Sequence, residues 1–179
     1  MSKQRDYLLL ELQELFQQMV SNKKSFGSMN TKKLMAKIKK QNIVFDNDDH
    51  HDSHEFLSWL LNEVHENVLA DAKEANVQVK NSFVTELFEG RVVNVTKCLT
   101  CESGGRREEA FLALSVDLEK NTSLSHCLKM FSHKELMLNR DKFYCEECQT
   151  KQVAVRQAHF LKNPKAIIFH LKRFKIDQQ

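Results

Sequence analysis

Four of the five cysteines in this 179-residue chain form two pairs with identical spacing. The pairs, here called knuckles, read Cys98-Leu99-Thr100-Cys101 and Cys145-Glu146-Glu147-Cys148. Two intervening residues let one tight turn direct both sulfurs at a common point. A second such turn completes the tetrahedron of soft donors that Zn²⁺ prefers, each about 2.3 Å from the metal. We therefore predict that Cys98, Cys101, Cys145 and Cys148 bind one Zn²⁺ as a cofactor.

The two knuckles are distant in sequence, since Cys101 and Cys145 lie 44 positions apart. Compact zinc modules have about 15–20 residues between their cysteine pairs. The spacing thus favours a metal that joins the tips of two separate β-hairpins over one that nucleates a small domain. Four buried structural thiols are an open alternative. A disulfide framework is less favoured, because the number of cysteines is odd.

Other residues that could take part in catalysis or metal binding carry weaker sequence signals. Cys127 falls in the apolar stripe of a predicted helix, which indicates a small core residue and not a nucleophile. His50, His51 and His54 are close together, but they straddle a predicted helix start and have no acidic neighbours at ligand-like spacing. We do not expect a functional metal site at these histidines.

Composition limits the class of protein. The chain is 41% hydrophobic and 28% charged, which suits one globular domain or a large part of one. Its formal net charge of +3 is spread over scattered lysines and arginines, so we expect no nucleic-acid partner. No apolar run approaches the roughly 20 residues of a membrane span, and no signal peptide is evident at the start. Unpaired cysteines indicate a reducing compartment, cytoplasm or nucleus.

Helices are predicted over the first half of the chain, from apolar spacings of three and four. The first covers residues 6–20, with the stripe Leu8, Leu12, Leu15, Phe16 and Met19. Asn30 or Thr31 caps the second. Asp52, followed three residues later by Glu55, forms a capping-box pattern that starts the third, which runs through Val68. Residues 70–82 read as a linker or a frayed helix end.

Strands are predicted after Gly90, where the apolar period changes to two. One holds Val93, Val95 and the first knuckle. Others are expected over 106–119, 152–161 and 165–175, the last two as a hairpin turning at Pro164. A helix over 123–132 interrupts them. Helices followed by strands predict an α+β fold.

Four segments, in the same order, resemble the ubiquitin-specific proteases, a family of cysteine deubiquitinases. His51-Asp52-Ser53-His54-Glu55-Phe56-Leu57 looks like that family's Gln-Asp-Ala-His-Glu-Phe-Leu box, and the knuckles look like its zinc-binding fingers. Residues 111–118, Phe-Leu-Ala-Leu-Ser-Val-Asp-Leu, resemble its Phe-Leu-Asp-Leu-Ser-Leu strand. His170-Leu171-Lys172-Arg173-Phe174 matches its His-Leu-Lys-Arg-Phe strand. The likeness covers nearly the whole chain.

The resemblance implies the central part of a papain-like cysteine protease domain. Residues 1–75 would belong to the helical thumb, 83–160 would be the zinc fingers that grip ubiquitin, and 165–175 would be a palm strand. The implied activity is thiol-dependent cleavage of ubiquitin from protein conjugates, with ubiquitin and ubiquitinated proteins as partners. The nearest likeness is to small members that a WD40-repeat protein activates, so such an activator is a further expected partner.

By the same resemblance, Asp52 would line the channel that holds the C-terminal tail of ubiquitin. A fixed carboxylate at a helix start suits this role, because it can accept backbone amides or pair with an arginine. His51 stands where the family has Gln, and Ser53 where it often has Ala. Contacts to the tail at His51 are therefore expected to differ.

The family's reaction centre is not matched in this sequence. The nucleophilic cysteine normally precedes the first helix, whereas here no cysteine precedes Cys98. The catalytic histidine normally lies in a Gly-His-Tyr segment beyond the last strand, and here no Gly-His pair occurs. Cys127 and His170 are not expected to replace them. We expect a fragment or an inactive relative.

The sequence is compatible with two other functions. One is a non-catalytic, zinc-containing module that binds ubiquitin or a WD40-repeat partner. The other is a zinc ribbon that binds nucleic acid, which the acidic residues beside the knuckles (Glu102, Glu146 and Glu147) disfavour.

Overall fold

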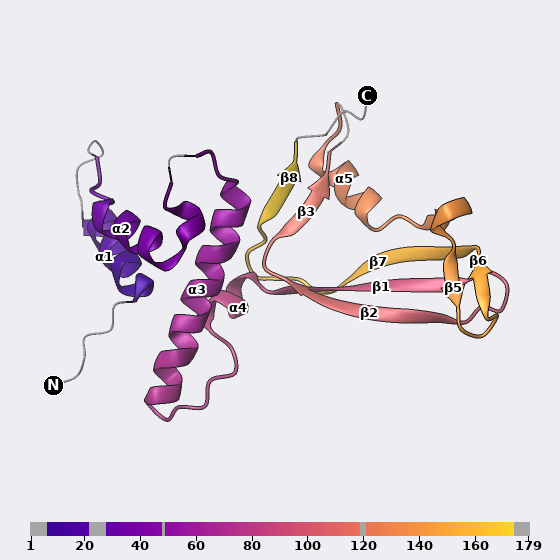
Figure 1. The fold of residues 1–179 in the computed structure, drawn as a ribbon, viewed down its shortest axis with the longest axis horizontal. Coiled ribbons are helices and arrows are strands. Elements are labelled where there is room, and N and C mark those ends of the chain that lie inside the picture. The colour runs from indigo at the N-terminus through magenta and orange to yellow at the C-terminus, as the bar shows by residue number, and fades with distance from the viewer. Residues whose placement is uncertain (1–6, 22–27, 48, 119–120, 174–179) are drawn as a thin grey trace. The chain divides into compact units, whose positions relative to one another are not determined.

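The computed structural model describes residues 7–21, 28–47, 49–118 and 121–173. The chain divides into two compact units, Met1–Val84 and Thr85–Gln179, which we describe one at a time. Helices make up the first unit and strands dominate the second, so the predicted α+β class is confirmed (Figure 1). The finer division into thumb, fingers and palm stays a prediction.

The described residues of the first unit form three complete α-helices and a short 3₁₀ turn. These elements are α1 (Leu8–Ser21), α2 (Lys32–Gln41), η1 (Ile43–Phe45) and α3 (Ser53–Glu74), and the short α4 (Phe83–Phe88) begins at its end. Among the described residues, no helix combines the length and the apolar character needed to cross a membrane. Helix α3 continues to Glu74, so residues 70–74 of the segment predicted as a linker or a frayed helix end are helical.

The core of the first unit forms where α1, α2, η1 and α3 meet. Leu8, Ile38 and Phe45 are buried, and the Phe45 ring lies 5.3 Å from the ring of Phe56. Leu12, Leu34, Trp59 and Leu60 pack around them. In the predicted apolar stripe of α1, Leu8 at the start is buried, whereas Phe16 near the other end is 59% exposed.

Asp52 and Asn30, two of the residues predicted to cap helices, accept hydrogen bonds at the starts of α3 and α2. Oδ1 of Asp52 accepts a hydrogen bond from the amide of His54 at 2.6 Å, which satisfies one of the free amides of the first turn of α3. At the start of α2, Oδ1 of Asn30 accepts from the amide of Lys32 at 3.0 Å. Thr31 occupies the cap position itself without a side-chain hydrogen bond.

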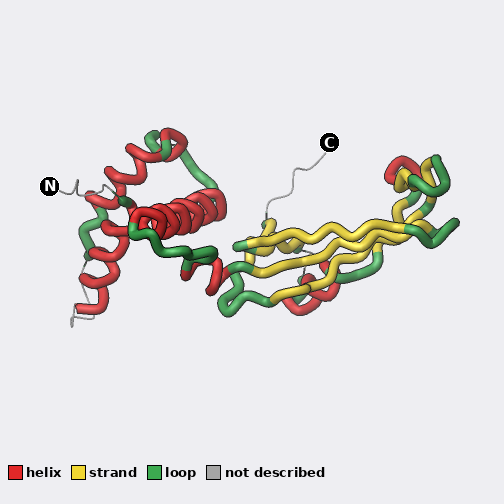
Figure 2. The backbone as a smooth tube through the Cα atoms, turned by 90° about the horizontal axis from the view of Figure 1, so that it is seen from below, coloured by secondary structure: helices red, strands yellow, loops and turns green. Residues whose placement is uncertain are grey.

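Among its described residues, the second unit contains three β-sheets, the last residues of α4 and one further α-helix; Figure 2 shows the strands in yellow. A four-stranded antiparallel sheet has the order β2-β1-β7-β4, β3 pairs with β8 in parallel, and β5 pairs with β6. The strands are β1 (Gly90–Cys98), β2 (Gly104–Phe111), β3 (Leu114–Asp117), β4 (Glu135–Met137), β5 (Phe143–Cys145), β6 (Thr150–Gln152), β7 (Ala154–Lys162) and β8 (Phe169–Lys172). The 3₁₀ turn η2 (Asn139–Asp141) precedes β5.

The prediction that residues 106–119 form a single strand is wrong. The chain bends after Phe111, so that β2 belongs to the four-stranded sheet and β3 to the two-stranded parallel sheet. Alternation of apolar residues continues through the bend, with Leu114 and Val116 buried, and therefore gave no sign of the change of sheet. Residue 119 lies outside the described residues.

The predicted hairpin around Pro164 is also wrong. Strand β7 pairs with β1 and β4, whereas β8 pairs in parallel with β3. The segment between β7 and β8 instead bonds elsewhere: the amide of Ala166 donates to the carbonyl of Leu87 at 2.8 Å. Of the predicted strand over 165–175, only Phe169–Lys172 is strand, and 174–175 lie outside the described residues.

The predicted helix over 123–132 is confirmed as α5 (Leu124–Phe131). The hydroxyl of Ser123 caps it by accepting from the amide of His126 at 3.2 Å. Its stripe covers β3, where Leu114, Val116 and Cys127 form a buried cluster surrounded by aromatic and aliphatic side chains. This packing confirms that Cys127 is a core residue.

Candidate metal centre

The first knuckle forms the tip of the β1–β2 hairpin. The amide of Cys98 donates to the carbonyl of Ser103 at 2.8 Å, and the amide of Thr100 approaches the sulfur of Cys98 at 3.4 Å. Glu102, just before Ser103, has a φ of 62°, the left-handed conformation that reverses the chain in a tight turn. The knuckle is therefore closed by its own hydrogen bonds.

The second knuckle forms the tip of the β5–β6 hairpin and repeats this design. Cys145 pairs with Thr150 in the sheet register, and Gln149 has a φ of 53° at the position that corresponds to Glu102. Two hairpin tips were predicted from the spacing, and both are present. Figure 1 shows the β5–β6 hairpin beside the ends of β1 and β2.

The four predicted ligands meet at one point. The sulfurs of Cys98, Cys101, Cys145 and Cys148 all lie within 4.8 Å of one another. The Cys101 and Cys145 sulfurs are 3.4 Å apart, far beyond the about 2.05 Å of a disulfide. Sulfurs of a zinc tetrahedron lie about 3.8 Å apart, given bonds of about 2.3 Å. The cluster therefore has the size and the donor set of a four-thiolate metal site.

Direct bonds between the hairpins also hold the two knuckles together. The amide of Leu99 donates to the carbonyl of Val153 at 2.9 Å. The hydroxyl of Thr100 donates to the side-chain carbonyl of Gln152, also at 2.9 Å. These bonds join the first knuckle to the last residue of β6 and to the residue after it, so the protein fold also fixes the positions of the sulfurs.

Hydrogen bonds shift the pKa of Cys98, Cys145 and Cys148 in different directions. The pKa of Cys145 is lowered to about 6, first by the Ser103 hydroxyl and then by the amide of Cys148. The backbone amide of Cys101 lowers the pKa of Cys98. The pKa of Cys148 is raised to about 12, first by the hydrogen bond between its sulfur and that of Cys101 and then by burial. The cluster thus holds a proton that a divalent cation can displace.

One contributor to the cluster was missed in the sequence. The hydroxyl of Ser103 lies 3.0 Å from the sulfur of Cys101 and 3.4 Å from that of Cys145. A sequence signal existed, because both knuckles continue as Cys-x-x-Cys-x-Ser or Cys-x-x-Cys-x-Thr, with Thr150 at the equivalent position.

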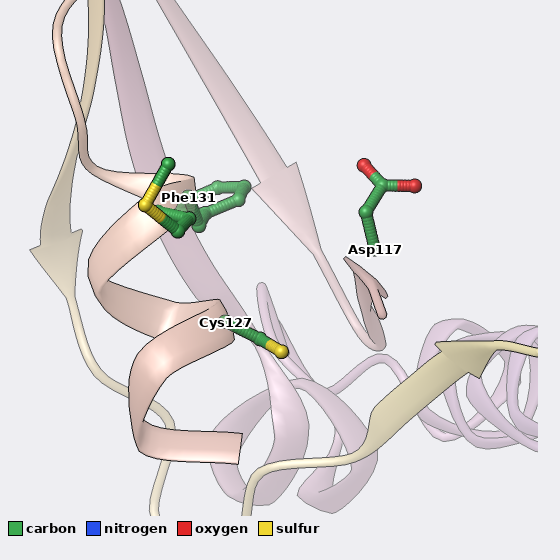
Figure 3. A pocket seen from close by; sticks show the side chains of 4 residues that line it. Asp117, Cys127 and Phe131 are labelled. Carbon is green, nitrogen blue, oxygen red and sulfur yellow. The ribbon is translucent and has the colours of Figure 1, made fainter. Parts of the chain in front are cut away.

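The remaining candidate residues lie outside the cluster. Cys127 is 3% exposed beside a cavity of about 130 Å³ that Asp117, Met130 and Phe131 also line (Figure 3). Its sulfur lies 3.5 Å from the hydroxyl of Thr122.

The histidines are engaged elsewhere. Nδ1 of His170 lies 3.1 Å from the hydroxyl of Ser115, on the paired strand. Nε2 of His51 lies 2.6 Å from Oδ1 of Asn47. Asp52 is exposed at the start of α3.

Comparison with solved structures supports the fold. A SAGA DUB module of Ubp8, Sgf11, Sus1 and Sgf73 bound to monoubiquitin aligns with a TM-score of 0.75 and 26% identity, covering 96% of this chain and 38% of the other. The same module bound to ubiquitin aldehyde gives a TM-score of 0.67 and 25% identity, covering 92% and 42%.

Sequence comparison identifies the family. Ubiquitin carboxyl-terminal hydrolase 12 of Salmo salar is 36% identical over 195 aligned positions, covering 99% of this chain and 52% of the relative. Ubiquitin carboxyl-terminal hydrolase 46 of Caenorhabditis elegans is 31% identical over 220, covering 96% and 52%. The chain spans about half the length of these relatives. The sequence model of the ubiquitin carboxyl-terminal hydrolases matches residues 1–179, and the chain therefore belongs to that family.

Proposed function

We propose that this protein acts in the thiol-dependent removal of ubiquitin from protein conjugates, and that its four clustered cysteines hold a structural Zn²⁺. The observation that supports this most directly is the convergence of two distant knuckles on one point, in a chain that matches the family along its full length. When bound, the metal supplies a cross-link between two hairpins.

The 179 residues by themselves are proposed to bind ubiquitin without hydrolysing it. A cysteine protease needs a thiolate and an imidazole within hydrogen-bond reach, about 2.6–3.2 Å. Cys127 is buried against Thr122, and His170 faces Ser115, so these two residues have different partners. The other cysteines belong to the metal centre.

A fluorogenic ubiquitin C-terminal amide tests this division between binding and hydrolysis. We expect the zinc-loaded chain to bind ubiquitin in a direct titration and to release no fluorophore. Steady release that a thiol alkylator abolishes would contradict the proposed inactivity of the chain. Failure to bind ubiquitin, in a chain shown to be folded and zinc-loaded, would contradict the proposed function.

Asp52 is proposed to contact the C-terminal tail of ubiquitin. Its support is its exposure at the start of α3, where the carboxylate is held by the amide of His54. The Asp52→Asn variant separates this role from capping, because asparagine caps a helix as well as aspartate does but carries no charge.

The measurement compares ubiquitin with ubiquitin that lacks its C-terminal tail. We expect Asp52→Asn to weaken binding of the intact form and to leave binding of the truncated form unchanged, with no loss of thermal stability. Equal effects on both forms would show that Asp52 does not contact the tail.

The proposed location is the cytoplasm or nucleus, because a four-thiolate centre needs reduced cysteines. An activating WD40-repeat partner is proposed from the family resemblance alone. Co-purification of such a protein with the zinc-loaded chain, and not with a zinc-stripped one, is the expected outcome.

A further inference from the structure

The sulfurs of the cluster are not equally supplied with hydrogen-bond donors. A Zn²⁺ ion with four thiolates carries a net charge of −2, and partial burial makes that charge costly unless donors surround it. Backbone amides face the first cysteine of each knuckle: those of Thr100 and Cys101 serve Cys98, and that of Cys148 serves Cys145. Cys101, the second cysteine of the first knuckle, instead has the side-chain hydroxyl of Ser103 beside its sulfur.

The Ser103 hydroxyl is a side-chain hydrogen-bond donor that belongs to the first knuckle. Its hydroxyl lies 3.0 Å from the sulfur of Cys101, the exposed member of the set, and 3.4 Å from that of Cys145. A thiolate is an acceptor, so the hydroxyl proton is donated to it. The two sulfurs come from different knuckles, and the hydroxyl therefore bridges the two halves of the site.

We propose that the Ser103 hydroxyl is a positioning group of the metal centre, which retains the metal by donating its one proton mainly to the thiolate of Cys101 at 3.0 Å, in a bond shared with the more distant thiolate of Cys145 at 3.4 Å. This inference rests on the proposed metal centre. Partners of this kind around metal ligands typically contribute about 10–100-fold to metal affinity. The proposal is specific to the side chain, because the backbone carbonyl of Ser103 has its own bond to the amide of Cys98.

The second knuckle offers a matched control. Thr150 occupies the position equivalent to Ser103, five residues after the first cysteine of its knuckle. It is exposed, and among the described residues no hydrogen bond joins its hydroxyl to a sulfur of the cluster. Ser103→Ala and Thr150→Val each remove one hydroxyl from the same place in a knuckle, but only the first removes a contact to the metal ligands.

The experiment measures zinc affinity of the full chain by competition with a chromophoric chelator. We expect Ser103→Ala to weaken binding by about 10-fold or more, Thr150→Val to leave it unchanged, and Ser103→Thr to restore most of it. Cobalt-loaded protein gives a second readout: the sulfur-to-cobalt charge-transfer band should shift in Ser103→Ala and not in Thr150→Val.

The outcomes separate the two proposals. Equal affinities for wild type and Ser103→Ala, or equal losses in Ser103→Ala and Thr150→Val, would overturn the role of the Ser103 hydroxyl while leaving the metal centre intact. A wild-type chain that binds no zinc would overturn both. Unchanged circular dichroism of the metal-loaded variants controls for misfolding.

Discussion

Replacing Cys145 with serine removes a buried sulfur from the cysteine cluster and breaks the proposed zinc cross-link between the two hairpins. Cys101 and Cys145 are 44 positions apart. Closing a loop of that length lowers the entropy of the unfolded chain enough to stabilise the fold by about 4 kcal/mol in the chain-entropy model. Whole domains are stable by only about 5–15 kcal/mol. We therefore expect local unfolding around the knuckles in Cys145→Ser.

Amide hydrogen exchange, read peptide by peptide, locates the effect. A loss of about 4 kcal/mol corresponds to about a thousandfold faster exchange where closing is fast and the exchange rate follows the opening equilibrium. We expect this in peptides from β1, β5 and β6, together with loss of the zinc. The single tryptophan, Trp59, packs in the core of the first unit, so its fluorescence should report unchanged unfolding there.

Cys127→Ala is the control for this experiment. It removes a buried sulfur too, but one in the apolar cluster of α5 and β3. It should destabilise its surroundings by about 1 kcal/mol and leave one zinc bound per chain. If Cys145→Ser exchanges no faster than the wild type, or if stripping zinc from the wild type changes nothing, the metal cross-link does not contribute to stability and the reasoning fails.

Three further predictions concern the glycines of the hairpin, pH and a helix cap. Gly104→Ala should destabilise the β1–β2 hairpin by about 1–3 kcal/mol, because its Cβ would overlap the carbonyl of Thr96, whereas Gly105→Ala meets nothing within 4 Å and should be tolerated; urea midpoints compare them. Since the pKa of Cys148 is raised to about 12, zinc binding at neutral pH must release its proton, so zinc affinity should fall as pH falls, measured by chelator competition across pH. Asp52→Ala should cost the first unit about 1 kcal/mol, seen as a lower midpoint in tryptophan fluorescence; an unchanged midpoint would show that the cap is dispensable.

Local patterns predicted much of this protein. Apolar spacing placed α1, α2, α3 and α5, and Asp52 marks the start of α3 because its carboxylate accepts a free amide of the first turn. The knuckles were predicted to meet because two identical cysteine spacings suit one tetrahedral ion. The helices and each single knuckle depend on residues within a few positions of one another, which a sequence displays directly. The meeting of the two knuckles, with Cys101 and Cys145 44 positions apart, was predicted only because one ion would need both.

Strand pairing could not be predicted in the same way. Residues near Pro164 have the composition of a hairpin, but β8 pairs with β3, and Ser115 and His170 are 55 positions apart. The apolar alternation specifies which face of a strand is buried and not which strand lies beside it. The role of Ser103 was missed for a related reason, since its contact with Cys145 depends on how two hairpins meet.

The order of the knuckles along the chain has a consequence for biosynthesis. A ribosome that adds about 5–20 residues per second completes Cys145 roughly 2–9 s after Cys101. During those seconds the nascent polypeptide carries half a chelate. The bond between Cys98 and Ser103 lies within that half, so its shape does not depend on the unmade remainder. The proposed zinc site therefore cannot be complete until translation has delivered the second pair of sulfurs.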